Sequence, residues 1–226
     1  MYDTRLKNAY ATGSYKVPYH TFKAIPFRDF DEVYVNSATA ANVKFEQGDY
    51  NVRIDSNAEK SIRIKQNGRR LQIDVDFGDY NSYNPNPYLL LISCPALTAV
   101  HTGATYVKQH KVFTDTIARN ALDARPVTIA GFKLDSLSIT QDYGSMVVLT
   151  NNKIGYLNVV SGESQNSASA TVIESSNQFD STRFDIQQYS KLSLDAARIN
   201  KWQFQIGDHA KLELSGTAKK FIPSFR

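Results

Sequence analysis

Apolar and polar residues alternate along the C-terminal half of the chain, and the alternating pattern returns at a nearly fixed interval. Residues 183–194 read RFDIQQYSKLSL, and residues 203–214 read QFQIGDHAKLEL. Phe184 and Leu192 are each followed 20 positions later by the same residue type. Alternation with a period of two indicates strands that bury one face. A repeat of this length indicates a module that completes its core only by stacking on its neighbours.

The same interval extends upstream, where Leu137 and Ile139 are followed 20 positions later by a leucine and a valine. The interval is longer before Phe184, and the additional residues lie in the Ser/Asn/Glu-rich segment 162–169. At about 3.3 Å per strand residue, one repeat has a contour of roughly 66 Å, which suits one turn of a solenoid. We therefore expect an all-β fold in which this half is a right-handed parallel β-helix (β-solenoid). An ordinary antiparallel sandwich is the alternative.

The N-terminal half keeps a shorter interval, because apolar pairs recur there every 9 or 10 residues. These pairs are Val33/Val35, Val43/Phe45, Val52/Ile54, Ile62/Ile64 and Leu71/Ile73. Two such steps make about 19 residues, close to the repeat of the other half. Asn67-Gly68 separates SIRIKQ from RRLQIDV and predicts a tight hairpin. We expect antiparallel strands at this end, although the spacing also permits a sandwich throughout.

Gly, Pro and polar clusters mark the connections between these strands. Residues 84–87, which contain two prolines, predict a loop, and residues 115–125 predict one short helix. Residues 1–26 carry aromatic side chains without alternation, so we expect an extended lead-in that covers an open sheet edge. The expected organisation is therefore one domain over residues 27–216, followed by a tail over residues 217–226.

Composition sets limits on the class of protein. The chain has 226 residues, 26 Lys and Arg against 22 Asp and Glu, and 42% hydrophobic residues, which suffice for a sizeable core. No stretch approaches the about 18 to 20 apolar residues of a membrane helix. Basic residues form no run suited to a phosphate backbone, so we expect no nucleic-acid partner.

Cys94 is the only cysteine, so it forms no internal disulfide, and its apolar neighbours predict a small buried side chain. The first 16 residues lack the apolar core of a secretory signal. On this observation the protein is either cytoplasmic or has lost a leader.

Several segments together resemble the auto-transporter adhesin, head GIN domain family of Bacteroidetes-type bacteria. The residues that carry the resemblance are Phe30, Val33, Val35, Val43, Phe45, Gln47-Gly48, Tyr50, Val52 and Ile54, then Asn67-Gly68 with Leu71 and Ile73, then residues 92–97, ISCPAL, with Gly103-Ala104. The resemblance spans about residues 27–216. It implies opening strands followed by β-helix coils, an extracytoplasmic location (periplasm or cell surface), and adhesion. The corners here read HTGAT, QDYGS, QQYSK and GDHAK, whereas the family usually has a Ser-Gly-Ala corner. No family site residues are transferred, because the family has no agreed ones.

Catalytic chemistry finds little support in the sequence. Of the motifs that pectin-cleaving β-helix enzymes share, only an R-x-K matches, at residues 63–65 inside the expected hairpin. Glycoside hydrolysis needs two carboxylates about 5 to 9.5 Å apart. Asp142 and Asp208 occupy comparable corners, but several strand spacings of about 4.8 Å separate them. We therefore predict no catalytic residues.

Cofactor sites are not predicted either. His20, His101, His110 and His209 show no metal-binding spacing, and the chain contains neither a G-x-G-x-x-G nor a Walker loop.

One candidate binding feature is a column of corner residues. Aligning the repeats at Ile139, Ile186 and Ile206 brings three dipeptides to similar positions: Asp142-Tyr143, Gln188-Tyr189 and Asp208-His209. Flat side chains flanked by carboxylates and amides bind sugar rings by stacking and hydrogen bonding. The same residue types also simply fill turns and satisfy backbone groups, so this structural role stays open.

The leading hypothesis is a non-enzymatic binding or adhesion module of the cell envelope, with a glycan or a surface protein as partner. A polysaccharide-active enzyme and a purely structural scaffold are the alternatives.

Overall fold

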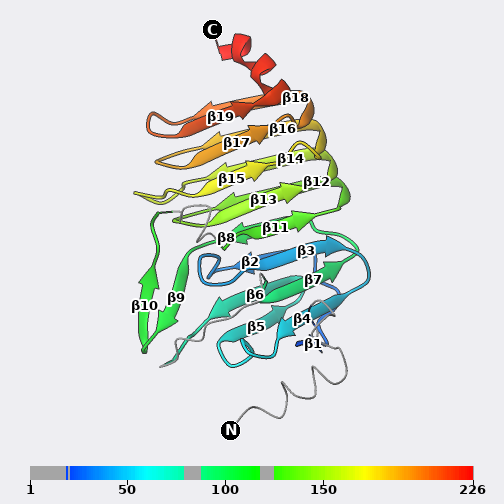
Figure 1. Ribbon diagram of the computed structural model, residues 1–226, viewed down its shortest axis with the longest axis vertical. Helices are drawn as coiled ribbons and strands as arrows, with labels where there is room; N and C mark the ends of the chain where they lie inside the picture. Colours follow the sequence, from blue (N-terminus) through cyan, green and yellow to red (C-terminus); the bar gives the residue numbers. More distant parts are fainter. Residues whose placement is uncertain (1–18, 20, 79–87, 118–124, 226) are drawn as a thin grey trace, which may run out of the picture.

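The computed structural model describes residue 19 and residues 21–78, 88–117 and 125–225. Within these residues the fold is all-β, without an α-helix, and ends in a 3-10 helix, η2 (Gly216–Phe225). The strands stack one above another along the long axis of the molecule, with the C-terminus at one end (Figure 1). The all-β prediction is confirmed.

Two large sheets contain nearly all of the strands. The nine-stranded sheet consists, in spatial order, of β1 (Phe22–Ile25), β4 (Asn51–Asp55), β7 (Leu90–Cys94), β3 (Val43–Gln47), β11 (Val127–Ala130), β13 (Met146–Thr150), β15 (Ala170–Ile173), β17 (Lys191–Asp195) and β19 (Lys211–Ser215). The eight-stranded sheet consists of β18 (Arg198–Ile206), β16 (Gln178–Ile186), β14 (Lys153–Ser161), β12 (Lys133–Gln141), β8 (Ala99–Thr102), β2 (Glu32–Val35), β6 (Arg70–Val75) and β5 (Ile62–Asn67). A separate hairpin consists of β9 (Thr105–Lys108) and β10 (Lys111–Thr114).

From β12 to β19 the chain alternates between the two sheets, and every pairing among these strands is parallel. Phe184 pairs with Phe204, and Leu192 pairs with Leu212. The 20-residue step predicted from the alternating pattern is therefore confirmed from β12 to β14, from β16 to β18 and from β17 to β19, whereas β14 and β16 are separated by a longer step. These parallel pairings also exclude the alternative of an antiparallel sandwich throughout.

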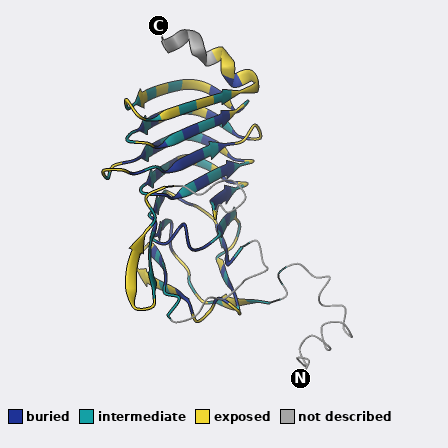
Figure 2. Ribbon diagram, turned by 60° about the vertical axis from the view of Figure 1, so that its left-hand side comes forward, coloured by how far each residue is buried: buried dark blue, intermediate teal, exposed yellow. Residues whose placement is uncertain are grey.

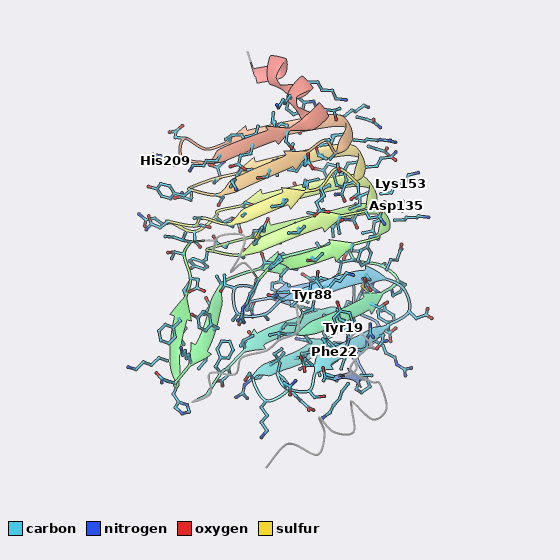
Figure 3. The ribbon with its side chains drawn as sticks, viewed as in Figure 1. Tyr19, Phe22, Tyr88, Asp135, Lys153 and His209 are labelled. Atoms are coloured by element: carbon cyan, nitrogen blue, oxygen red, sulfur yellow. The ribbon has the colours of Figure 1, made fainter. Side chains whose placement is uncertain are left out.

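Each regular unit is a nine-residue strand, a four-residue corner, a five-residue strand and a two-residue corner. Each nine-residue strand has one position that is not paired with the neighbouring strand. This position is Asp135 in β12 and Gly155 in β14. A Cβ at Gly155 would lie 2.7 Å from the backbone oxygen of Asp135, so the two strands approach closely there. Figure 3 labels Asp135 on the side of the molecule opposite the β9–β10 hairpin.

The interval before Phe184 stretches at two corners. The corner at 162–169 has eight residues instead of four, which confirms that the polar segment holds part of the excess. The second corner, at 174–177, is also longer than its counterparts.

The N-terminal half mixes parallel and antiparallel pairs. Strands β5 and β6 form the predicted antiparallel hairpin, and Gly68 in its turn has φ 59°, a conformation that glycine adopts without strain. The expected step of about 19 residues is wrong here, because Val33 pairs with Leu71 and with Val100. After β2 the chain forms β3 and β4 in the nine-stranded sheet, then β5, and then β6, which pairs with β2. The sequence separation between paired strands is therefore longer than 19 residues.

The inward side chains of both sheets form one core. Its largest fully buried members include Phe30, Phe45, Phe132, Phe179 and Phe184. Burying one such side chain stabilises the fold by about 1.5 to 3 kcal/mol relative to exposure.

Cys94 is completely buried, as its apolar neighbours predict. Burial raises the pKa of its thiol to about 12, which makes the side chain inert at neutral pH.

Some predicted segments lie wholly or largely outside the described residues. The predicted loop at 84–87 lies there, as do residues 118–124 of the predicted helix. Of the predicted lead-in, β1 is described, and it pairs antiparallel with β4 at the edge of the nine-stranded sheet. A membrane-spanning helix does not occur in the described part of the chain.

Candidate functional site

A cavity of about 570 Å³ opens between the eight-stranded sheet and the β9–β10 hairpin. The hairpin projects from the side of the strand stack in Figure 1, and β10 is exposed along its length in Figure 2. The cavity is lined by Asn36, Ser37, Arg63, Asp74, Val75, Asp76, Gly103, Thr105, Tyr106, Val107, Val112 and Tyr143. These residues come from both halves of the chain, so the cavity exists only in the assembled fold.

Asp74 of β6 is held in place by two amide side chains. Its Oδ1 accepts a hydrogen bond from Asn36 Nδ2 at 2.8 Å, and its Oδ2 accepts one from Gln72 Nε2 at 2.8 Å. Neutral donors of this kind fix the orientation of a carboxylate without cancelling its charge.

Asp76 is the second acidic residue of the cavity. It accepts hydrogen bonds from the backbone N–H of Gly78 at 3.0 Å and from Arg63 Nη2 at 2.7 Å. These two bonds lower the pKa of Asp76 below its ordinary value, the Gly78 bond being the larger cause. A general acid in glycoside hydrolysis needs a raised pKa, so Asp76 does not suit that role.

The hairpin supplies the apolar wall of the cavity. Val107 and Val112 face each other across the two strands, and Val112 is 70% exposed. Tyr106 stacks on Phe113 with ring centroids 5.8 Å apart, and the edge of Phe77 meets Tyr106 at 5.9 Å. The hairpin therefore rests on aromatic contacts at its base and leaves an apolar pair open to the cavity.

Of the six predicted corner residues, only Tyr143 lines the cavity. It lies in the corner after β12 with φ 53°, a left-handed conformation that a bulky residue rarely adopts. Its carbonyl accepts hydrogen bonds from the Ala168 N–H at 3.2 Å and from Ser167 Oγ at 3.3 Å. The neighbouring corner thus holds Tyr143 in this conformation.

The alignment used to predict the corner column is wrong: Ile139 is shifted by two residues, and Asp142-Tyr143 lies one position out of register with the other two dipeptides. Ile139 lies in the same register row as Phe184 and Phe204, and not in the row of Ile186 and Ile206. The error arose because inward positions two residues apart are all apolar, so either alignment matches the hydrophobic pattern.

The structure brings only two members of the predicted column into ring contact. Tyr189 and His209 stack with centroids 5.1 Å apart and planes 14° apart, and Tyr189 is 52% exposed. Figure 3 shows His209 on the same side of the molecule as the β9–β10 hairpin. Asp142 instead binds the backbone N–H of Ser164 at 3.1 Å and the hydroxyl of the same residue. The eight-residue corner at 162–169 separates the Asp142 corner from the Tyr189 corner.

A second polar cluster lies on the outer face of β2, β6 and β8. Tyr34 stacks on His101 with centroids 4.1 Å apart, and Arg70 lies over the tyrosine ring at 4.3 Å. Glu32 pairs with Arg70 at 3.2 Å and lies 3.5 Å from His101 Nε2. Burial lowers the pKa of His101, whereas the hydrogen bond from Arg70 lowers that of Glu32.

Sequence reasoning missed both the cavity and this cluster. His101 was considered only as a metal ligand, and no group of three His, Cys, Asp or Glu side chains suited to a metal occurs among the described residues. The cavity residues share no motif or period, so no sequence signal connects Asp74 with Tyr106 and Tyr143. The tripeptide Gly-Asp-Tyr occurs twice, at residues 48–50 and 78–80, and the second copy lies largely outside the described residues.

Comparison with known proteins finds no matching family model and no matching curated protein. Among solved structures, the chain is similar to a candidate adhesin from Parabacteroides distasonis, with 16% identity, a TM-score of 0.48, and coverage of 87% of this chain and 72% of that one. It is also similar to a candidate adhesin from Bacteroides fragilis, with 12% identity, a TM-score of 0.43, and coverage of 85% and 95%. A candidate lipid-binding protein from Parabacteroides distasonis matches with 14% identity, a TM-score of 0.31, and coverage of 87% and 94%. Likenesses this distant establish neither a family nor a function.

Proposed function

We propose that this chain is a non-enzymatic binding module of the cell envelope or cell surface, and that it holds its ligand in the cavity beside the β9–β10 hairpin. The observation that carries the proposal is the cavity itself. Its volume of about 570 Å³ falls in the usual range for ligand sites of roughly 300 to 1,000 Å³. Its lining combines polar groups in fixed orientations with an apolar wall, which is the usual composition of a binding site.

The polar groups of the cavity favour binding over catalysis. Both oxygens of Asp74 and both oxygens of Asp76 already accept hydrogen bonds from the protein. A catalytic carboxylate pair needs one member with a raised pKa and one free to attack or to activate water.

We also propose the β-solenoid architecture and the extracytoplasmic location that are expected from the sequence. Parallel pairing and 20-residue units support a right-handed parallel β-solenoid over the C-terminal half, within one domain over residues 27–216. The resemblance to head GIN adhesins suggests the extracytoplasmic location. The corner pair Tyr189 and His209 is proposed as a secondary contact, because its rings are stacked and partly exposed.

A glycan array followed by a product assay tests this function. The full chain is applied to an array of bacterial and host glycans, and each glycan that binds is then incubated with the protein. We expect binding without new reducing ends or unsaturated products. Turnover that is lost in an Asp74→Asn or Asp76→Asn variant would identify an enzyme instead. Failure to bind any glycan would leave the scaffold hypothesis.

Two tyrosine variants separate the cavity from the corner pair. Tyr143 lines the cavity, whereas Tyr189 stacks on His209 in another corner. We expect Tyr143→Ala to weaken binding on the array more than Tyr189→Ala does. The reverse order would move the main contact to the corner pair.

A further inference from the structure

We infer that the ligand of the cavity is an uncharged sugar residue, bound with its hydroxyl groups against β6 and with one apolar ring face against the β9–β10 hairpin. This inference rests on the proposed binding function and names the chemical class of the ligand. It follows from the chemistry of the two walls and from the charge of the lining.

The polar wall offers acceptors suited to hydroxyl donors. An ionised carboxylate has about four lone-pair positions, so each oxygen of Asp74 has capacity for one hydrogen bond beyond the one it receives. Asn36 and Gln72 hold the carboxylate in one orientation at 2.8 Å each. Because the acceptors are already oriented, a ligand hydroxyl binds them without the entropic cost of ordering a flexible side chain.

The same wall also offers donors. Arg63 uses one N–H group on Asp76 at 2.7 Å, and its guanidinium carries five N–H donors in all. Donors and acceptors therefore lie side by side on β5 and at the end of β6. A sugar hydroxyl both donates and accepts, so it is the simplest ligand group that satisfies this pairing.

The opposite wall is apolar and incompletely covered. Val107 and Val112 pair across the hairpin, and Val112 is 70% exposed. A two-stranded hairpin without a further sheet is marginally stable in water. A sugar ring has an apolar C–H face that packs on such residues and on aromatic rings, and Tyr106 and Tyr143 also line the cavity. A bound ring would bury Val112 and connect the hairpin to the sheet.

The charge of the lining selects against acidic sugars. Its charged residues are Arg63, Asp74 and Asp76, which gives one positive and two negative charges. A uronic acid or sialic acid would place a further carboxylate in the same cavity as those of Asp74 and Asp76, and neighbouring like charges repel. The lining therefore disfavours an acidic sugar relative to a neutral one.

Titration with defined sugars tests this inference on the full chain. The probes are the methyl glycosides of glucose, galactose, mannose and N-acetylglucosamine, with methyl glucuronide as the acidic comparison, measured by calorimetry and by saturation-transfer NMR. We expect at least one neutral glycoside to bind, and the glucuronide to bind at least tenfold more weakly. Asp74→Asn, which retains side-chain size, and Val112→Lys, which places a charged chain on the apolar wall, should each weaken binding at least tenfold.

Two control variants outside the cavity test whether the loss of binding is specific to the cavity residues. Asp180→Asn changes an exposed aspartate that likewise contacts an asparagine, Asn200, at 3.4 Å, and it lies on β16 away from the cavity. Tyr156→Ala removes an exposed tyrosine from β14. Both should leave the dissociation constant within twofold of the wild-type value.

The outcomes separate this inference from the proposed function. If glycans bind on the array but Asp74→Asn and Val112→Lys leave the affinity unchanged, the cavity is not the sugar site, and the binding function stands. The ligand class is wrong if the glucuronide binds preferentially and both variants abolish that binding. It is also wrong if the array is positive and no neutral glycoside binds. If neither array nor probes bind, the proposed function itself fails.

Discussion

At the scale of single residues, two buried asparagines join neighbouring units. Asn177 Nδ2 donates to the carbonyls of Leu149 at 2.7 Å and Glu174 at 2.8 Å. Its Oδ1 accepts from the backbone N–H of Asn152 at 3.0 Å and from the side chain of the same residue at 2.9 Å. Every polar atom of this buried side chain is thus satisfied, and backbone groups of the adjoining unit depend on it.

Removing that side chain should be costly. Asn177→Ala leaves the backbone N–H of Asn152 without its side-chain acceptor, and the Leu149 carbonyl keeps only the N–H of Glu174 as donor. An unsatisfied buried group costs about 1 to 3 kcal/mol, and each further lost hydrogen bond costs about 1 kcal/mol. We expect a loss of about 3 kcal/mol in the free energy of unfolding, measured by urea denaturation. Asn200→Ala is the control, because Asn200 is exposed and makes one long hydrogen bond, of 3.4 Å. An equal loss of stability in the two variants would contradict a structural role for the hydrogen bonds of Asn177.

His101 makes stability depend on pH. Burial lowers its pKa below the ordinary 6.5, with Arg70 acting in the same direction and Glu32 and Glu163 opposing. A histidine with a lowered pKa contributes stability above pH 6.5, and that contribution is lost as the pH falls through 6.5 toward the folded-state pKa. Glu32, whose pKa is also lowered from 4.5, loses its contribution only at still lower pH.

A histidine variant isolates this effect. We expect the melting temperature of the wild type to fall by about 2 °C more than that of His101→Gln between pH 7.5 and pH 5.5. The other histidines are present in both proteins, so their contributions cancel in the difference. Parallel pH profiles would mean that His101 titrates in the folded state as it does in the unfolded chain.

At the scale of elements, the corners are stacked closely enough to require glycine at one position. Gly162 begins the long corner after β14 with φ 84°. A Cβ there would overlap the carbonyl oxygen of Gln187 and lie 2.7 Å from Ser190 Oγ. Gly131 also has a positive φ, 75°, but nothing lies within 4 Å of the Cβ position.

The two glycines form a matched pair of substitutions. Gly131→Ala should cost about 1 kcal/mol, from the left-handed backbone alone. Gly162→Ala adds a steric overlap with the next corner, so we expect a further loss of about 1 to 3 kcal/mol. Thermal and urea unfolding of both variants measure the difference. Similar losses would show that the corners are not in contact in solution.

The strand pairings also show which parts of the fold can be predicted from the sequence. The step from Phe184 to Phe204 was predictable because one chain segment repeats the next, and each repeat pairs with the unit beside it. The pairing of Val33 with Leu71 and Val100 was not, because strands of the other sheet intervene in the sequence without a fixed length. Apolar periodicity indicates which face is buried, and it does not identify the neighbouring strand.

The candidate site was even less accessible from the sequence. Tyr143 was predicted as a binding residue, but as a member of a column whose register is wrong. Asp74, Val112 and Tyr143 line one cavity only because the β9–β10 hairpin lies beside the end of β6, where Asp76 pairs with Val107. A site assembled from non-repeating segments leaves no spacing in the sequence, so only the three-dimensional structure reveals it.

At the scale of the whole molecule, the stack of units is buried unevenly along its axis. Leu192 and Leu194 of β17 are buried, whereas the equivalent Leu212 and Leu214 of β19 are only partly buried. Among the stacked strands of the C-terminal half, Figure 2 likewise shows more exposed positions in the last strands before the C-terminus. In a stack of repeats each unit is stabilised by its two neighbours, whereas the last unit has a strand neighbour on one side only and is followed by η2, of which Ala218 is buried in the core.

This gradient predicts where unfolding begins. Leu192→Ala removes a fully buried side chain and should cost about 3 kcal/mol, whereas Leu212→Ala should cost about 1 kcal/mol, because less apolar surface is lost. Hydrogen exchange followed by mass spectrometry should show faster exchange in residues 198–215 than in residues 178–195, although the two segments have the same strand lengths and pair in a 20-residue register. If the two leucine variants cost the same and the two segments exchange equally, another layer covers the last unit in solution. The C-terminal end would then be an interface and not a free end of the stack.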